Sequence, residues 1–131
     1  MSDITDRIGE VSESIARTAC ERLREQGKIR SYLCVDTHGI DFLLITSCWQ
    51  AMPLQVKTSW FGAKRHYKKY PGIPVIVIRH RSVRMNKRRK RCLVETAEFQ
   101  ILELLAVRKY TISFMFFLFV FSRKLQSRYA A

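Results

Sequence analysis

Acidic residues are missing from a long central part of this sequence. The chain has 11 Asp and Glu against 24 Lys and Arg, a net charge of +13, and no acid lies between Phe42 and Val94. The same segment holds 13 basic residues, of which eight fall within residues 79–91. A field of one sign favours a polyanionic partner, most often nucleic acid. A solvated basic loop or a localisation signal would explain residues 86–91 alone, but not an acid-free zone of more than 50 residues.

The sequence also lacks the patterns of export, of a disulfide framework and of a membrane span. Its first ten residues, MSDITDRIGE, are polar and acidic, whereas a secretory signal begins basic and then apolar. The longest apolar run, residues 112–121, is too short for a bilayer, which needs about 20 residues. No CxxC pair or zinc-like Cys–His spacing occurs, which indicates reduced thiols at Cys20, Cys34, Cys48 and Cys92. We therefore expect an intracellular protein of the cytoplasm or nucleoid.

The length of 131 residues and the 47% hydrophobic content fit one folded domain over residues 1–131. Apolar residues recur at helical spacing from Ile4 to Leu23, and this pattern predicts a helix over residues 3–26. Bulky apolar segments with short turns between them predict three strands of an antiparallel meander, over residues 28–37, 40–46 and 54–60. Residues 47–53 are expected to be the connection between the second and third strands.

The second half of the chain predicts further helices and one more strand. A short basic helix is expected over residues 61–70, and the β-branched run VIVI at 75–78 predicts a strand with a parallel neighbour in the sheet interior. Residues 79–92 are expected to form a basic arm or loop, and residues 94–110 an amphipathic helix. The whole order predicts an α/β fold, a central mixed sheet flanked by helices, with an α-β-β-β-α-β core, a C-terminal helix and an apolar tail.

The apolar tail at residues 112–121 contains five Phe in ten residues. Basic residues stand on both sides of it, at Arg108 and Lys109 and at Arg123 and Lys124. We expect a buried strand or a contact between copies of the chain. An interfacial membrane contact is the second, less favoured interpretation.

Three polar side chains on two neighbouring predicted strands carry the chemistry. Asp41 begins the second strand, and Gln55 and Lys57 lie two residues apart on the third, so their side chains share one face. If the two strands pair as a hairpin, the three side chains converge at one end of it. A carboxylate and an amide oxygen suit Mg²⁺, or Mn²⁺ in its place, and a lysine beside them can stabilise charge that develops on a phosphate.

The stretches GID (39–41) and LQVK (54–57) resemble the core of the PD-(D/E)XK nuclease superfamily. The resemblance covers roughly residues 8–78 and implies a small resolvase-like, homing-type or restriction-type endonuclease. It implies that Asp41 is the metal-binding acid, that Gln55 occupies the position usually held by Asp or Glu, and that Lys57 is the catalytic lysine. Gln55 departs from the pattern, because a neutral amide removes one negative charge from the metal site.

The same resemblance implies a glutamate contributed by the first helix. Glu10, Glu13 and Glu21 are the candidates, and Glu13 is preferred because it borders the apolar stripe that faces the sheet. Asp36 is an alternative metal ligand, although a turn formed with Gly39 is the favoured interpretation.

Some aromatic residues and histidines have weaker signals. His66 and His80 lie among basic residues and are expected to touch phosphate. Trp49 and Trp60 are expected to pack in the core or at its rim.

These observations predict a Mg²⁺-dependent endodeoxyribonuclease that works as a homodimer or higher homo-oligomer. The alternative is a protein that binds nucleic acid without cleaving it, on a degenerate nuclease scaffold. In both cases the phosphate contacts are expected from basic residues after the third strand: Lys64, Arg65, Lys68, Lys69, Arg79, Arg81, Arg84, Lys87, Arg88 and Arg89.

Overall fold

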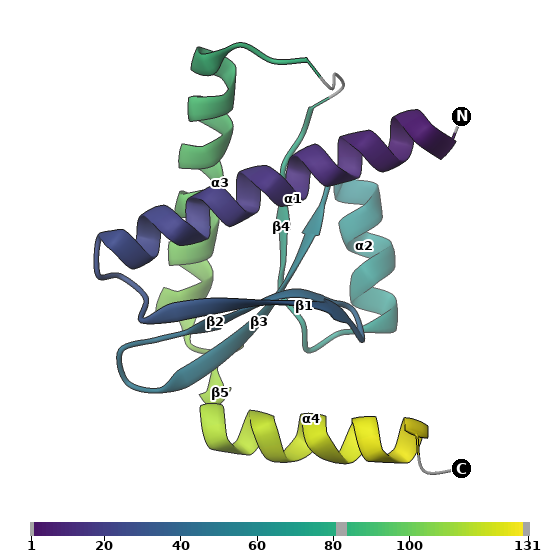
Figure 1. Ribbon diagram of the computed structural model, residues 1–131, viewed down its shortest axis with the longest axis vertical. Helices are drawn as coiled ribbons and strands as arrows, with labels where there is room; N and C mark the ends of the chain where they lie inside the picture. Colours follow the sequence, from purple (N-terminus) through teal and green to yellow (C-terminus); the bar gives the residue numbers. More distant parts are fainter. Residues whose placement is uncertain (1, 81–83, 130–131) are drawn as a thin grey trace.

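The computed structural model (Figure 1) describes the backbone of residues 2–80 and 84–129, and the side chains of residues 7–80, 84–120, 122 and 123. The protein is α/β with a mixed sheet flanked by helices, as predicted, and the described residues form five strands and four helices. The elements in chain order are α1 (Ser2–Glu25), β1 (Ser31–Thr37), β2 (Ile40–Ile45), β3 (Gln50–Lys57), α2 (Trp60–Lys69), β4 (Val75–Val77), α3 (Lys87–Val107), β5 (Ile112–Ser113) and α4 (Phe114–Tyr129).

The sheet has the strand order β1-β2-β3-β4, and β5 also pairs with β3. Strands β1, β2 and β3 form the predicted antiparallel meander, whereas β4 runs parallel to β3. The short strand β5 is antiparallel to β3 and pairs with its first two residues. Thus β3 is the central strand, and its two ends have different neighbours on one edge.

Strand β3 begins at Gln50, four residues earlier than predicted, and it includes Pro53. A proline is normally excluded from a central strand because it has no N–H to donate. The N–H of Gln55 donates to the carbonyl of Pro74, on the β4 side, so by alternation the nitrogen of Pro53 faces that side too. Position 53 lies in the gap between the residues that pair with β5 and those that pair with β4. Pro53 therefore costs no ladder hydrogen bond.

Strand β4 pairs in parallel as predicted, but it lies at the end of the sheet rather than in its interior. Its free edge is capped by a side chain of α3. The N–H of Val77 donates to Gln100 Oε1 at 2.9 Å, and Gln100 Nε2 donates to the carbonyl of Val77, also at 2.9 Å. One glutamine amide thus replaces the missing neighbour strand.

The main core lies between one face of the sheet and the helices α1 and α3. It joins the buried side chains of α1, such as Ile15 and Leu23, to those of β2 and β3, such as Phe42 and Leu54, and to Ile101 of α3. In Figure 1, α1 crosses α3 and β4. The other face carries two smaller apolar clusters, one beneath α4 and one beneath α2.

The basic arm predicted over residues 79–92 is only partly a loop. Helix α3 begins at Lys87, because the side chain of Asn86 accepts a hydrogen bond from the N–H of Arg89 at 2.8 Å and caps the first turn. Lys and Arg are good helix formers and continue that turn. The predicted helix over 94–110 therefore starts seven residues earlier and takes up much of the arm.

The prediction of a buried strand over residues 112–121 was wrong. Only Ile112 and Ser113 form a strand, and α4 follows at once. The N–H of Phe114 still donates to the carbonyl of Trp49, which lies just before the start of β3. The strand stops there because its partner strand has ended.

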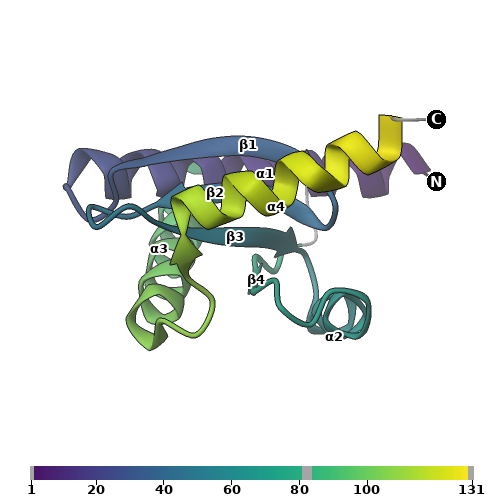
Figure 2. The ribbon, with the colours of Figure 1, turned by 90° about the horizontal axis from the view of Figure 1, so that it is seen from below.

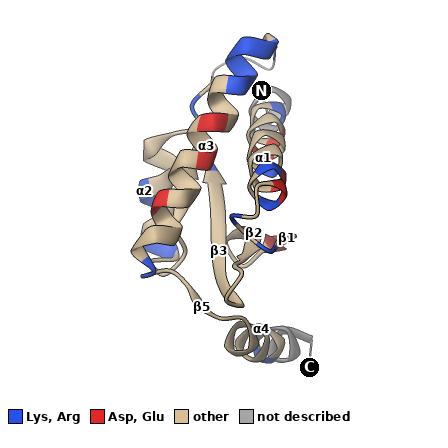
Figure 3. Cartoon of the chain, turned by 90° about the vertical axis from the view of Figure 1, so that its left-hand side faces the viewer, with Lys and Arg blue, Asp and Glu red and all other residues tan. Residues whose placement is uncertain are grey.

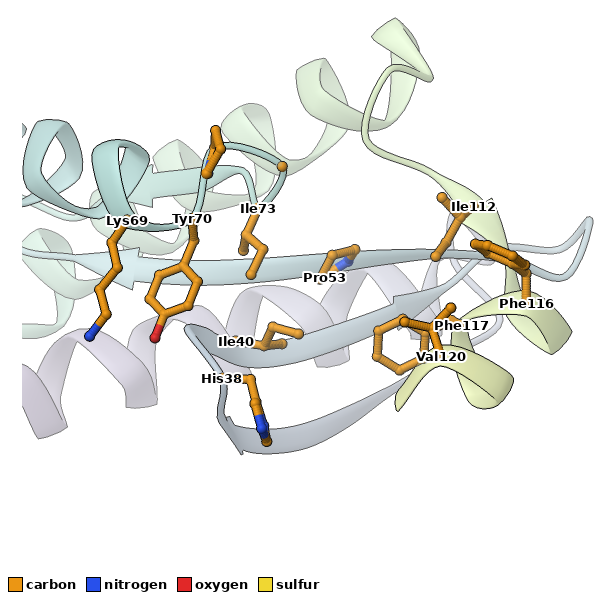
Figure 4. A pocket seen from close by; sticks show the side chains of 12 residues that line it. His38, Ile40, Pro53, Lys69, Tyr70, Ile73, Ile112, Phe116, Phe117 and Val120 are labelled. Carbon is orange, nitrogen blue, oxygen red and sulfur yellow. The ribbon is translucent and has the colours of Figure 1, made fainter. Parts of the chain in front are cut away.

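Among the described side chains of α4, Phe117 is the buried one; it packs with Ile40 and Leu43, and the half-buried Phe114 packs against the same cluster. Figure 4 shows the cavity beside it, about 390 Å³ in volume, between Phe117 and the Tyr70–Ile73 segment. Among the described residues, none of the helices combines the length and the apolar character that crossing a bilayer requires.

Candidate active site

Asp41 lies where β2 starts and is held against β3. The register of the two strands pairs Phe42 with Leu54, which places Asp41 opposite Gln55. Its Oδ2 atom accepts a hydrogen bond from the N–H of Val56 at 2.9 Å, and the residue is only 9% exposed. Gln55 and Lys57 flank Val56, so this bond places the carboxylate between the two polar residues of β3.

Helix α1 brings Glu13 to the same place. Glu13, Gln55 and Lys57 line one cavity of about 470 Å³, together with Ser12 and His80. Of the other two candidates from this helix, Glu10 is exposed. Glu21 lies about two helical turns after Glu13, and it forms an ion pair with Arg24. Glu13 is therefore the glutamate of α1 that reaches Gln55 and Lys57.

Asp36 is a third acid at this place, and the prediction of a turn with Gly39 was wrong for it. Strand β1 pairs Cys34 with Phe42 and Thr37 with Ile40, which leaves two residues of β1 opposite Asp41 alone. This is a β-bulge, a feature that re-aims side chains. Asp36 has a left-handed φ of 50°, a conformation that Asp adopts more readily than most residues.

Carboxylate oxygens of Glu13, Asp36 and Asp41 lie within 4.8 Å of one another. The sequence favoured a turn for Asp36, because a β-bulge interrupts the alternation of side chains between the two faces of a strand and the alternation alone does not predict it. The one local signal was the apolar pattern of β1, which breaks at CVDT.

Burial and mutual repulsion raise the pKa of two of these acids. Burial is the main cause for Glu13, followed by the charges of Asp41 and Asp36. Burial is also the main cause for Asp41, where the N–H of Val56 and the ammonium of Lys57 act in the opposite direction and Asp36 adds to the rise. Burial and repulsion make it unfavourable to hold these carboxylates together in ionised form, and a hard divalent cation such as Mg²⁺ or Mn²⁺ would offset that repulsion by binding their oxygen atoms. Gln55 can add a neutral oxygen to this set.

Lys57 lies against the first turn of α2. A Cβ atom on Gly62 would stand 3.7 Å from Cδ of Lys57, so the helix backbone packs along the lysine stem. Burial, and then the ammonium of Lys57, lower the pKa of His66 on the same helix. His66 is only 6% exposed, which contradicts the predicted phosphate contact for it.

His80 is also buried, and it lines the cavity with Glu13, Gln55 and Lys57, so its predicted phosphate contact stays a prediction. Its Nε2 atom lies 2.7 Å from the hydroxyl oxygen of Ser12, which is itself buried. This pair joins α1 to the segment after β4. It forms the wall of the cavity next to Glu13.

The described basic residues among the predicted phosphate contacts lie on α2, on the segment between β4 and α3, and on the first turn of α3. Four are exposed on α2, namely Lys64, Arg65, Lys68 and Lys69. Arg79, Arg84, Lys87, Arg88 and Arg89 are exposed after β4, and the start of α3 is blue in Figure 3. Arg81 lies outside the described residues.

Neither tryptophan belongs to the core, so of the two predicted positions only the rim remains. Trp49 is 53% exposed and has the guanidinium of Arg30 4.3 Å from its ring centroid. Trp60 is 63% exposed.

Comparisons with protein-family models, with curated proteins and with solved structures find no match to this chain. The interpretation of the site therefore depends on its own residues.

Proposed function

We propose that this protein is a metal-dependent DNA endonuclease that hydrolyses phosphodiester bonds. One observation carries the proposal. Carboxylate oxygens of Glu13, Asp36 and Asp41 lie within 4.8 Å of one another, and Glu13 also lines a cavity with Gln55 and Lys57 of β3. This arrangement agrees with the resemblance to the PD-(D/E)XK superfamily seen in residues 39–41 and 54–57.

The donor set fits a divalent cation. Glu13, Asp36 and Asp41 would hold Mg²⁺ or Mn²⁺, with the side-chain oxygen of Gln55 as a further ligand. A cation bound there supplies electrophilic stabilisation of a phosphate oxygen and lowers the pKa of a coordinated water. Asp41 is oriented for this role by its hydrogen bond from Val56.

Lys57 provides a positive charge next to the acids. Burial raises the pKa of Asp41, and the ammonium of Lys57 partly opposes that rise, which indicates an electrostatic interaction between the two side chains. In this position Lys57 orients the attacking water and stabilises the negative charge that develops on the phosphorane. The packing of its stem against Gly62 restricts where the ammonium can reach.

The exposed cations of α2 and of the start of α3 supply affinity for the phosphate backbone. These contacts do not discriminate between DNA sequences, because they are made to phosphate groups and not to the edges of the bases. Binding is expected to weaken steeply as salt rises, since each neutralised phosphate releases counterions.

A homodimer would match the dyad of a DNA duplex. The exposed apolar residues of α4, among them Met115, Phe116 and Phe119, offer a contact for it. Sedimentation of the wild type and of Phe116→Asp tests this, and a single monomeric species for both would contradict it.

One observation favours the alternative of binding without cleavage. Gln55 gives the metal site one carboxylate fewer than the usual pattern, and a weaker site leaves a scaffold that still binds DNA through its basic helices. Asp36 offsets this loss, because it places a third acid within 4.8 Å of the other two. We therefore favour cleavage.

The test is a cleavage assay on supercoiled plasmid, linear duplex and a branched junction. Each is incubated with Mg²⁺, with Mn²⁺ or with EDTA. We expect cleavage with the cations only, and loss of cleavage in Asp41→Asn and Lys57→Met. Glu10→Gln is the matched control, since Glu10 is exposed one turn from Glu13. Tight binding with no cleavage of any substrate would support the alternative.

A further inference from the structure

A further cavity lies on the α2 side of β4, between α2 and α3. It has a volume of about 990 Å³, and its lining includes Val75 and Val77 of β4. Figure 2 shows β4 between the two helices. We call this cavity the α2–α3 groove. Nothing in the site described above uses it.

The α2–α3 groove begins next to Lys57. Lys57 and Val77 are register partners on the parallel strands β3 and β4, so their side chains share one face of the sheet. Neighbouring strands lie about 4.8 Å apart. Trp60, which starts α2 three residues after Lys57, lines the groove as well. A chain lying in the groove would therefore pass the lysine of the site.

Two aromatic residues that line this groove, Trp60 and Phe99, belong to none of the core clusters. Trp60 and Phe99 are each 63% exposed, and both line it. Large exposed rings that contribute little to folding mark a binding surface when they gather in one place. Tyr110 adds a third ring, half-buried, further along.

The charges of the groove favour a polyanion. Arg79 and Lys109 are exposed and line it, and Lys109 Nζ lies 5.6 Å from the ring centroid of Tyr110. Glu103 is the acid in the lining. Two cations against one acid, on a chain with a net charge of +13, favour a negatively charged occupant of the groove.

The combination of rings and cations distinguishes single-stranded from double-stranded DNA. In a duplex the flat faces of the bases are stacked on one another, so an aromatic side chain can stack only on an unpaired base. The polar floor of the groove is already satisfied, because the amide of Gln100 bonds the backbone of Val77. Stacking without base-edge contacts tolerates any sequence.

We propose that the α2–α3 groove binds a single-stranded stretch of DNA, so that the substrate carries unpaired nucleotides beside the scissile phosphate. Its link to cleavage rests on the proposed nuclease function. The binding itself does not require cleavage, and it is measured separately.

The experiment measures binding in EDTA by fluorescence anisotropy. The labelled probes are a dT oligonucleotide, a blunt duplex and the same duplex with a single-stranded tail. We expect Trp60→Ala and Phe99→Ala each to weaken binding of the oligonucleotide and of the tailed duplex about tenfold or more, since stacking on one ring contributes that much. Blunt duplex binding should change less than about twofold, because no charge is removed.

Trp49→Ala is the matched control. Trp49 is also an exposed tryptophan, but it lies just before β3, at the other end of that strand from Lys57. We expect it to leave all three affinities unchanged. Circular dichroism melting confirms that each variant is folded.

Equal losses on blunt duplex and on the oligonucleotide, or no loss on either, would overturn the groove proposal. A shift from dimer to monomer in Trp60→Ala, with unchanged DNA affinity, would assign the groove to a second copy and overturn it too. The outcomes separate the two proposals. A protein that cleaves DNA but binds normally after Trp60→Ala refutes the groove alone, and selective loss of single-strand binding in a protein that never cleaves refutes the nuclease alone.

Discussion

The carboxylate of Asp41 accepts a hydrogen bond from the backbone N–H of Val56, across the strand pair β2–β3. This bond joins the acid to the residue that lies between Gln55 and Lys57. It also satisfies a buried backbone donor that no strand neighbour reaches, since the pairing of β2 with β3 ends at Phe42 and Leu54. One side chain thus serves both the fold and the proposed metal site.

Two substitutions at Asp41 separate these roles. Asp41→Asn keeps an oxygen that can accept the bond from Val56, whereas Asp41→Ala leaves a buried donor unpaired, at a cost of about 1–3 kcal/mol in the free energy of unfolding. We expect both to abolish cleavage, and only the alanine variant to be strongly destabilised. Urea denaturation and the plasmid assay measure the two effects. Equal destabilisation of both variants would contradict the structural role of the hydrogen bond.

Asp36→Asn tests the cluster of acids through its pH dependence. Removing the charge of Asp36 is expected to lower the pKa of Glu13 and of Asp41, because Asp36 raises both. An acid whose pKa is raised by folding destabilises the folded state once pH exceeds that raised value, and not below its ordinary value. The free energy of unfolding should therefore fall less between roughly pH 4 and pH 7 in Asp36→Asn than in the wild type.

Urea denaturation over this range of pH gives the measurement, and Glu25→Gln is the control because Glu25 is exposed at the end of α1. A pH profile of Asp36→Asn that overlays the wild type would show that the three acids do not interact.

Gln55→Glu restores the acid that the superfamily usually has. The extra charge is expected to tighten Mn²⁺ binding by on the order of tenfold and to lower the stability of the metal-free protein at pH 7. Isothermal titration with Mn²⁺ and thermal melting in EDTA measure the two changes. Gln50→Glu, at the other end of β3, provides the control. Unchanged Mn²⁺ affinity in Gln55→Glu would place residue 55 outside the metal site.

The basic start of α3 is expected to contribute salt-dependent affinity. A triple variant, Lys87→Ala with Arg88→Ala and Arg89→Ala, should reduce the slope of log affinity against log salt by about 0.9 for each phosphate that the protein no longer neutralises. A control triple variant removes the same charge elsewhere, at Lys28, Arg108 and Arg123, which are all exposed. Filter binding to a duplex at several salt concentrations measures both slopes. Equal slopes would mean that total charge, rather than this helix, governs binding.

The apolar patterns of the sequence predicted most of the fold correctly. The stripe in α1, the strands β1 and β2 and the parallel run of β4 follow from periodicity and β-branching, which reflect burial on one face or on both. The convergence of Asp41 with Gln55 also follows, because a hairpin of alternating residues brings polar positions at matched ends together.

The predictions of secondary structure failed where contacts with other parts of the chain outweighed the local preference of the residues. Pro53 is accepted in a central strand because the gap between β5 and β4 needs no donor from it. Asn86 caps α3, so the second part of the predicted basic arm is helical. The Phe-rich tail changes from strand to helix where β3 ends, which no property of residues 112–121 foretells.

Composition and alternation act along the chain, so they were sufficient to predict the α/β class, the acid-free basic segment and the strand positions of Asp41, Gln55 and Lys57. The packing of distant segments was needed to bring Asp36 to Glu13 and Asp41, since a bulge of one residue in β1 turns it toward β2. The same packing formed the groove beside Lys57, because Trp60 and Phe99 lie on separate helices and meet only when both pack around β4.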